Sequence, residues 1–146
     1  MPISALPSAG ETVTVSIEVA KGSWTKRRPD GSIDFVSPFP CPYNYGSIVG
    51  TSGADGDPLD AVVLGPRLPY GVRARVLVHG WVDFIDAGTP DPKLVCGPGS
   101  FTNRDRSGVE RFFRVYAGFK RVLYLMRRDP RGARTRSQGW SADKTW

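Results

Sequence analysis

The sequence predicts a mainly β protein with flanking α structure, arranged as a small barrel. Short segments of alternating or apolar character recur along the chain, and turn residues separate them, with 17 Gly and 13 Pro among 146 residues. Only one segment has clear helical spacing. Many short strands joined by turns are typical of barrels and sandwiches rather than of helix-rich folds.

The first strand is expected at residues 12–19. Its apolar side chains alternate strictly with polar ones, so one face is expected to pack on the core and the other to meet solvent. The apolar face consists of Val13, Val15, Ile17 and Val19. Glu18 therefore lies on the polar face. Further strands are expected between Gly and Pro turns at residues 33–36, 47–49, 61–64, 72–78, 81–85 and 94–96.

One helix is expected to begin at Ser107, because Ser107 and Glu110 have the spacing of a capping box. Apolar residues then recur at helical spacing: Val109, Phe112, Phe113 and Tyr116. Gly118 is the expected end of this helix. Residues 120–126 are expected to form a closing strand, and residues 127–146 an Arg-rich tail on a single domain spanning residues 1–146.

Composition narrows the partners and the compartment. The formal charge of +6 favours anionic partners, either phosphate compounds or nucleic acid. No apolar run is long enough for a membrane helix, and residues 1–10 lack signal-peptide features, so a cytoplasmic protein is expected. Cys41 and Cys96 have no CxxC spacing and suit reduced thiols better than a zinc site, although a single bridge stays open.

Carboxylates are concentrated in two places. Asp55-Gly56-Asp57-Pro58-Leu59-Asp60 carries three in six positions, and Asp86, Asp91 and Lys93 follow. Carboxylate oxygens suit hard divalent cations, and like charges this close together are costly without a cation. A surface turn is the alternative, since Asp, Gly and Pro are also turn formers. An EF-hand is disfavoured because Pro58 interrupts its pattern and Pro66 holds the twelfth position.

Several segments, in their order along the chain, resemble the soluble family I inorganic pyrophosphatases. They are Ile17-Glu18-Val19, Lys21-Gly22-Ser23, Lys26, Tyr43-Asn44-Tyr45-Gly46, Asp55 to Ala61, and Asp86 to Val95. The resemblance spans about residues 16 to 98 and resumes around Phe112, Phe113 and Tyr116. It implies a five-stranded, OB-like closed barrel with helices and an active site at its mouth. It also implies Mg²⁺-dependent hydrolysis of pyrophosphate, with Mn²⁺ or other divalent ions as substitutes.

The resemblance implies a role for each matching residue. Asp57 matches the general base that acts on the attacking water. The metal ligands are Asp55, Asp60, Asp86 and Asp91, with Glu18 as an outer carboxylate. The residues that match phosphate-binding positions are Lys26, Tyr45, Lys93 and Tyr116. The family also implies a homo-oligomer, with hexamers typical of bacterial members.

Two of these positions have plainer interpretations. Lys26 precedes Arg27 and Arg28, so a solvated basic turn also explains it. Tyr116 falls on the apolar stripe of the expected helix and could belong to the core. His79 is the only histidine, and no catalytic role is assigned to it.

The chain departs from the family at four positions around the phosphate. Arg28 stands where the family has Glu, Phe35 in place of a phosphate-binding Arg, Cys41 in place of Tyr, and Ala117 in place of Lys. Metal ligands are thus retained while phosphate contacts are fewer. Arg27, Arg28 or Lys120 could supply the missing charge.

Three functional classes follow. The leading one is an inorganic diphosphatase. The second is a related enzyme that acts on another phosphoanhydride, because the replaced residues open or depolarise the pocket. The third is a non-enzymatic, OB-like nucleic-acid-binding or scaffold protein; a basic groove, however, does not need six acidic residues at pyrophosphatase spacing.

Overall fold

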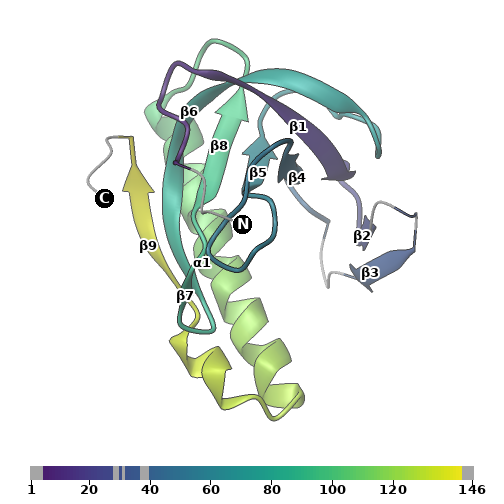
Figure 1. The fold of residues 1–146 in the computed structure, drawn as a ribbon, viewed down its shortest axis with the longest axis vertical. Coiled ribbons are helices and arrows are strands. Elements are labelled where there is room, and N and C mark those ends of the chain that lie inside the picture. The colour runs from purple at the N-terminus through teal and green to yellow at the C-terminus, as the bar shows by residue number, and fades with distance from the viewer. Residues whose placement is uncertain (1–4, 28–29, 31, 37–39, 143–146) are drawn as a thin grey trace.

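Five strands close into a mixed β-barrel (Figure 1). The structure is a computed structural model and describes residues 5–27, 30, 32–36 and 40–142. Around the barrel the order is β1 (Thr12–Val19), β4 (Asn44–Ile48), β5 (Asp60–Val63), β8 (Lys93–Gly97) and β6 (Arg73–Asp86). Pairing of β6 with β1 closes the ring, and β5 and β8 are its parallel pair. The predicted five-stranded closed barrel is confirmed.

The strand β6 replaces two predicted strands, 72–78 and 81–85, with one continuous element of 14 residues. The sequence between them does not turn. The register of β6 against β8 slips by one residue between Val78 and Gly80, which is typical of a β-bulge. The first part of β6 pairs with β1, and the later part pairs with β8 and with β9 (Arg136–Ser141).

Four short elements complete the sheet structure. A hairpin of β2 (Thr25–Arg27) and β3 (Ile33–Val36) stands apart from the barrel, and β7 (Thr89–Pro90) folds back on the end of β6. In Figure 1, β9 lies along the outer side of β6. The Arg-rich segment after residue 126 therefore contributes a strand to the sheet, reached through the 3₁₀ helix η1 (Pro130–Arg134).

The helix α1 (Asn103–Met126) corrects three sequence-based expectations. It begins before Ser107, because Thr102 and Asp105 form the capping box through reciprocal hydrogen bonds of 3.1 and 2.9 Å. It does not end at Gly118, since one glycine costs a helix only about 1 kcal/mol. Residues 120–126 are helical rather than a closing strand, because β6 already closes the barrel by pairing with β1.

Two apolar clusters hold these elements together. One fills the barrel and includes Val15, Ile17, Ile48, Trp81 and Leu94. The other lies between barrel and helix, where the buried stripe Val109, Phe113 and Ala117 meets Val82, Phe84 and Val95. Among the described residues, no helix combines the length and apolar character needed to cross a membrane.

Gly80 marks the place where β9 approaches β6 most closely. A Cβ atom there would lie 2.7 Å from the Ser141 carbonyl oxygen and 2.5 Å from the Trp140 ring. We expect Gly80→Ala to lower the free energy of unfolding by about 1–3 kcal/mol, because the strand must shift to admit the methyl group. Urea denaturation measures this loss.

Gly99→Ala is the matched control, since a Cβ atom at Gly99 meets nothing within 4 Å. Equal stability of the two variants would contradict the close approach of β9.

Candidate active site

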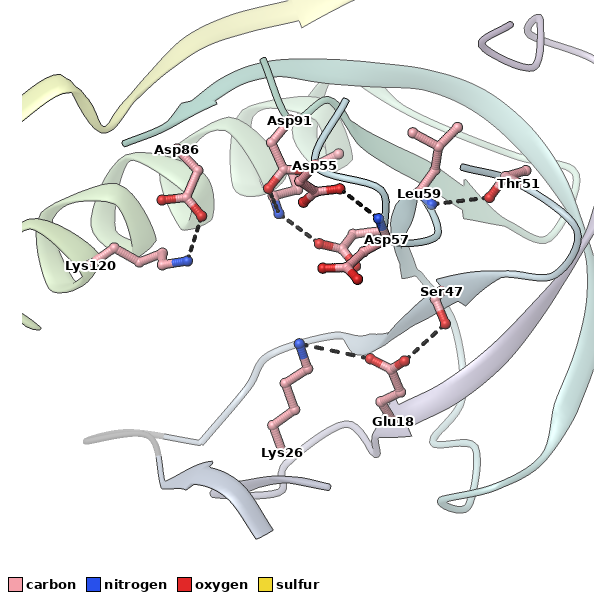
Figure 2. A network of polar contacts seen from close by, with 12 residues as sticks. Glu18, Lys26, Ser47, Thr51, Asp55, Asp57, Leu59, Asp86, Asp91 and Lys120 are labelled. Atoms are coloured by element: carbon pink, nitrogen blue, oxygen red, sulfur yellow. Dashed lines mark hydrogen bonds and ion pairs between the residues drawn. The ribbon is translucent and has the colours of Figure 1, made fainter. Parts of the chain in front are cut away.

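The predicted ionisable residues gather at one mouth of the barrel because of strand register. Asp60 begins β5, Lys93 begins β8, and the parallel pairing places these two residues side by side. The strand β6 runs antiparallel to β8 and ends at Asp86, at the same mouth. In Figure 2 the side chains of Asp57, Asp86 and Asp91 face a common space, with Lys26 across from them.

The most buried charge at this mouth belongs to Lys93, whose side chain is 2 % exposed. Its Nζ donates to Asp60 Oδ2 and to Asp91 Oδ2, both at 2.8 Å. Burial opposes the charged form of Lys93, yet the neighbouring Asp60 and Asp91 raise its pKa well above 10.5. The ammonium group therefore stays charged and neutralises carboxylates that would otherwise repel each other.

The two carboxyls around Lys93 differ in their protonation. Burial raises the pKa of both, but Lys93 and the more distant Lys26 reverse the shift for Asp60, whose pKa falls below 3.8. For Asp91, burial outweighs the attraction of Lys93, and the pKa rises above 3.8. Asp60 is thus the more firmly ionised of the pair.

Two side chains of α1 donate hydrogen bonds to the Asp86 carboxylate. Lys120 Nζ donates to Asp86 Oδ2 at 2.7 Å, and the Tyr124 hydroxyl donates to Asp86 Oδ1 at 2.8 Å. Burial raises the pKa of Asp86, but the bond from Lys120 and its charge more than reverse this, so the pKa is lowered. Burial and the bond to Asp86 raise the pKa of Tyr124 to about 12.

Tyr124 is the contact that sequence reasoning missed, because residues 120–126 were expected to be a strand. The signal was present in the chain: Tyr116, Lys120 and Tyr124 recur at intervals of four, which places them on one face of a helix. Lys120 was among the residues expected to supply missing charge, and it does reach the carboxylates.

Asp55 and Asp57 lie in an ordered turn above the barrel. The Asp55 carboxylate accepts the Asp57 N–H at 3.0 Å, and the Gly53 N–H donates to the Asp57 carbonyl at 2.7 Å. Buried Leu59 anchors the end of this turn, and its N–H donates to Thr51 Oγ1. Turn and site were alternatives in the sequence, but a turn is what presents the exposed Asp57 carboxylate to the mouth (Figure 2).

Glu18 and Lys26 border the other side of the mouth. Lys26 Nζ lies 3.8 Å from Glu18 Oε1, and the Ser47 hydroxyl donates to Glu18 Oε2 at 2.8 Å. Lys26 Nζ also lies 5.8 Å from the ring centre of Tyr45. Lys26 is therefore held between a carboxylate and an aromatic face, rather than in a solvated basic turn.

Tyr45 and Tyr116 supply hydroxyl groups at the mouth. Tyr45 is 5 % exposed, and its hydroxyl makes no hydrogen bond with the described residues, although it lies near enough to Asp60 to lower that pKa. Tyr116 packs on Phe84 as a core residue would, yet its ring centre is 5.8 Å from Lys93 Nζ and from Lys120 Nζ. Burial raises the pKa of both tyrosines, which keeps them as hydrogen-bond donors.

An apolar pocket adjoins the charged mouth. Its apolar walls are Val19, Trp24, Cys41, Phe112 and Phe119. Lys26, Tyr45 and Tyr116 line the pocket as well, so the pocket and the mouth share three residues. The departure at Cys41 thus falls on the pocket wall, whereas Ala117 is buried against the barrel.

The remaining sequence expectations fall elsewhere. Arg28 and the side chains of Arg27 and Phe35 lie outside what the structure describes. His79 stacks on Phe101 at 4.8 Å and bonds to the Pro98 carbonyl, which agrees with a structural role. Cys41 and Cys96 are both free, as expected for reduced thiols.

The donor chemistry of the mouth suits a hard divalent cation. Within the described residues, no three Asp, Glu, His or Cys side chains converge on one point as a ready metal site. The carboxylates are instead paired with Lys93 and Lys120. Their donors are all oxygen and face a shared space, which is the ligand type that Mg²⁺ and Mn²⁺ prefer.

Comparison with known proteins agrees with this architecture. The family model for inorganic pyrophosphatase matches residues 15–121. The chain is 37% identical to the inorganic pyrophosphatase of Synechocystis sp. over 106 residues, covering 66% of this chain and 61% of that protein. It is 31% identical to the inorganic pyrophosphatase of Streptomyces coelicolor over 123 residues, covering 70% and 75%. The chain spans about six tenths of the length of the first curated relatives.

Solved structures show the same fold. The inorganic pyrophosphatase of Thermus thermophilus superposes with a TM-score of 0.70 at 27% identity, covering 99% of this chain and 88% of that one. The fold and the charged mouth together define a barrel of the pyrophosphatase type. The chain belongs to the inorganic pyrophosphatase family.

Lys93 is more deeply buried than Lys120, so its removal should destabilise the protein more. We expect Lys93→Met to lower the free energy of unfolding by about 3–5 kcal/mol in metal-free protein at neutral pH, because Asp60 and Asp91 lose the ammonium group that is buried between them, at 2 % exposure. Lys120→Met is the matched control and should cost about 1 kcal/mol, since that pair is partly exposed. Chemical denaturation with chelator present measures both.

The cost of Lys93→Met should also depend on pH. Lys93 lowers the pKa of Asp60, so this part of the stability is present above pH 3.8 and is lost as the pH falls through the folded-state value below it. The difference between the proteins should therefore shrink in acid. A difference that grows on acidification would contradict the pairing.

Proposed function

We propose that the protein is a Mg²⁺-dependent inorganic diphosphatase that hydrolyses pyrophosphate to two phosphates. The observation that carries this proposal is the convergence of the carboxylates of β5, β6 and the 53–57 turn on a mouth that Lys26 borders from the opposite side. Anionic side chains for cations and cationic side chains for phosphate are both required for phosphoryl transfer. A basic nucleic-acid groove requires only the second set.

Asp55, Asp60, Asp86 and Asp91 would hold the metal ions, with Glu18 acting through water. Bound Mg²⁺ would lower the pKa of the attacking water and neutralise charge on the departing phosphate. The residues themselves support this assignment, because Asp60 and Asp86 both have lowered pKa values and stay ionised. Lys93 and Lys120 supply positive charge to the same carboxylates.

Asp57 would accept the proton of the attacking water. Its carboxylate is exposed and accepts no hydrogen bond from the described residues, so it is free to act on water. The backbone of the 53–57 turn fixes its position through the Asp55 carboxylate and Gly53. A general base needs this combination of fixed backbone and available oxygen.

Lys26, Tyr45 and Tyr116 would bind the phosphoryl groups, and Lys93 would add charge beneath them. Tyr45 supports this role, because burial raises its pKa and its hydroxyl keeps a proton that it can donate to an acceptor at the mouth. A phosphoryl oxygen is such an acceptor. Lys120 would replace the charge absent at Ala117, since it lies one turn further along the same helix.

We expect Asp57→Asn to lower turnover of pyrophosphate about a hundredfold or more, because the amide cannot accept the proton. Phosphate release with saturating Mg²⁺ measures the loss, and chelator should stop release in the parent protein. Calorimetry should show Mg²⁺ binding retained in the variant.

Glu110→Gln is the control, since the ion pairs of Glu110 with described residues are those with Arg106 and Arg114 on α1. Turnover that survives Asp57→Asn unchanged would remove the role assigned to Asp57. Release without any divalent ion would remove the metal-dependent mechanism.

We also infer that the protein acts in the cytoplasm as a homo-oligomer, a hexamer in the bacterial pattern of its family. Apolar side chains exposed on α1 support assembly: Val115, Val122, Leu125 and Met126, the last two at 75% and 76% exposure. Contiguous exposed apolar surface is typical of contact sites. Light scattering should show a mass that is a multiple of 16.0 kDa, and a monomer at micromolar concentration would reject the assembly.

A further inference from the structure

We propose that the apolar pocket is a subsite for the organic group of a diphosphate monoester. The enzyme would then hydrolyse small diphosphates that carry an apolar alkyl or aryl group, in addition to pyrophosphate. This inference rests on the proposed function, because the diphosphate would occupy the same charged mouth. The pocket walls, the shared residues and the state of Tyr45 carry it.

The pocket walls present carbon and sulfur surfaces. Trp24 is 52% exposed, and Phe119 lines the same pocket, so two aromatic side chains contribute carbon surface to the walls. The Cys41 thiol donates to the Tyr43 carbonyl at 3.0 Å, and burial raises its pKa, so it remains neutral. A neutral thiol with its hydrogen committed acts as an apolar wall.

The polar groups in the pocket favour an apolar ligand over a nucleobase. The Ser23 hydroxyl donates to the Thr25 carbonyl and accepts the Thr25 N–H, both at 3.4 Å, so this hydroxyl already has partners. A base edge placed against the carbon and sulfur walls would leave its donors and acceptors unpaired, which is costly. Hydrocarbon surface has no such requirement.

The pocket is joined to the phosphate site through Lys26, Tyr45 and Tyr116. Lys26 Nζ is directed toward Glu18 at the charged mouth (Figure 2), while the residue also lines the pocket. A diphosphate beside Lys26 therefore has the apolar walls within the same cavity. The Tyr45 hydroxyl stands at this junction, beside Asp60, and can donate to a phosphoryl oxygen.

The reaction balances without a further reactant. The water oxygen bonds to the terminal phosphorus, and the bond from that phosphorus to the bridging oxygen breaks. The electron pair stays on the bridging oxygen, which becomes an oxygen of the organic monophosphate. The proton taken up by Asp57 returns to the products, which are the monophosphate ester and inorganic phosphate.

Phenyl diphosphate and methyl diphosphate provide a matched pair of substrates, since they differ only in the apolar group. We expect kcat/KM for the phenyl ester to exceed that for the methyl ester by about tenfold, as burial of apolar area predicts. Phe119→Ser should remove most of this preference and change kcat/KM for pyrophosphate less than about twofold. Val72→Ser, at an exposed position directly before β6 and at the opposite end of that strand from Asp86, should change neither value.

Equal values for the two esters in the parent protein would overturn the inference. So would a preference for uridine diphosphate over phenyl diphosphate, because that ligand carries a polar base.

A binding measurement separates this inference from the proposed function. The phenyl and methyl esters of methylenediphosphonate cannot be hydrolysed at the bridge, and calorimetry with Mg²⁺ compares their affinities. Tighter phenyl binding without any pyrophosphate hydrolysis would uphold the pocket and reject the diphosphatase. Pyrophosphate hydrolysis with equal ester affinities would uphold the diphosphatase and reject the pocket.

Discussion

The buried ammonium of Lys93 is the interaction on which the site depends. Strand register places it beside Asp60, and the turn before β8 brings Asp91 to its other side. Two carboxylates this close would repel each other in a site of low dielectric, and each would resist ionisation. With Lys93 between them, the barrel can close around acidic residues and keep Asp60 charged. The same contact therefore stabilises the fold and prepares the site.

The helix α1 is the second wall of the site. Its buried stripe packs on the barrel, and the adjacent face carries Tyr116, Lys120 and Tyr124 toward the mouth. Because the helix runs to Met126, Lys120 and Tyr124 can both reach Asp86 from consecutive turns. Loss of a lysine at Ala117 is thus accompanied by a lysine one turn later. Positive charge on this face of the helix is therefore retained, and in this structure it is paired with Asp86.

At Cys41, by contrast with Ala117, a thiol takes the place of the Tyr hydroxyl that the family has at this position. A thiol that donates to a backbone carbonyl offers nothing to a phosphate, and it leaves the neighbouring pocket lined by Trp24, Phe112 and Phe119. One side of the mouth is therefore strongly charged while the side beyond Lys26 is apolar. The cavity is therefore charged on one side and apolar on the other, and a ligand with two such ends would be complementary to both.

The sequence by itself determined the elements whose signal is local. The residues of β1 and β3 were predicted as observed, because strict alternation or a bounded apolar run marks a strand. The spacing of Asp55, Asp57 and Asp60, and of Asp86, Asp91 and Lys93, indicated the family once the flanking segments were found in the same order. The length of α1 was not, since a short apolar run such as residues 120–126 fits a strand or a helix equally well.

Only the tertiary structure decided which charges meet. Lys120 and Asp86 are 34 positions apart, Lys93 and Asp60 are 33 apart, and no local pattern links either pair. The same holds for β9, whose place beside β6 depends on the close approach at Gly80, and for the apolar pocket, whose walls come from three separate segments. Local residue preferences select strands, turns and ligand types, whereas barrel closure and helix packing select the partners.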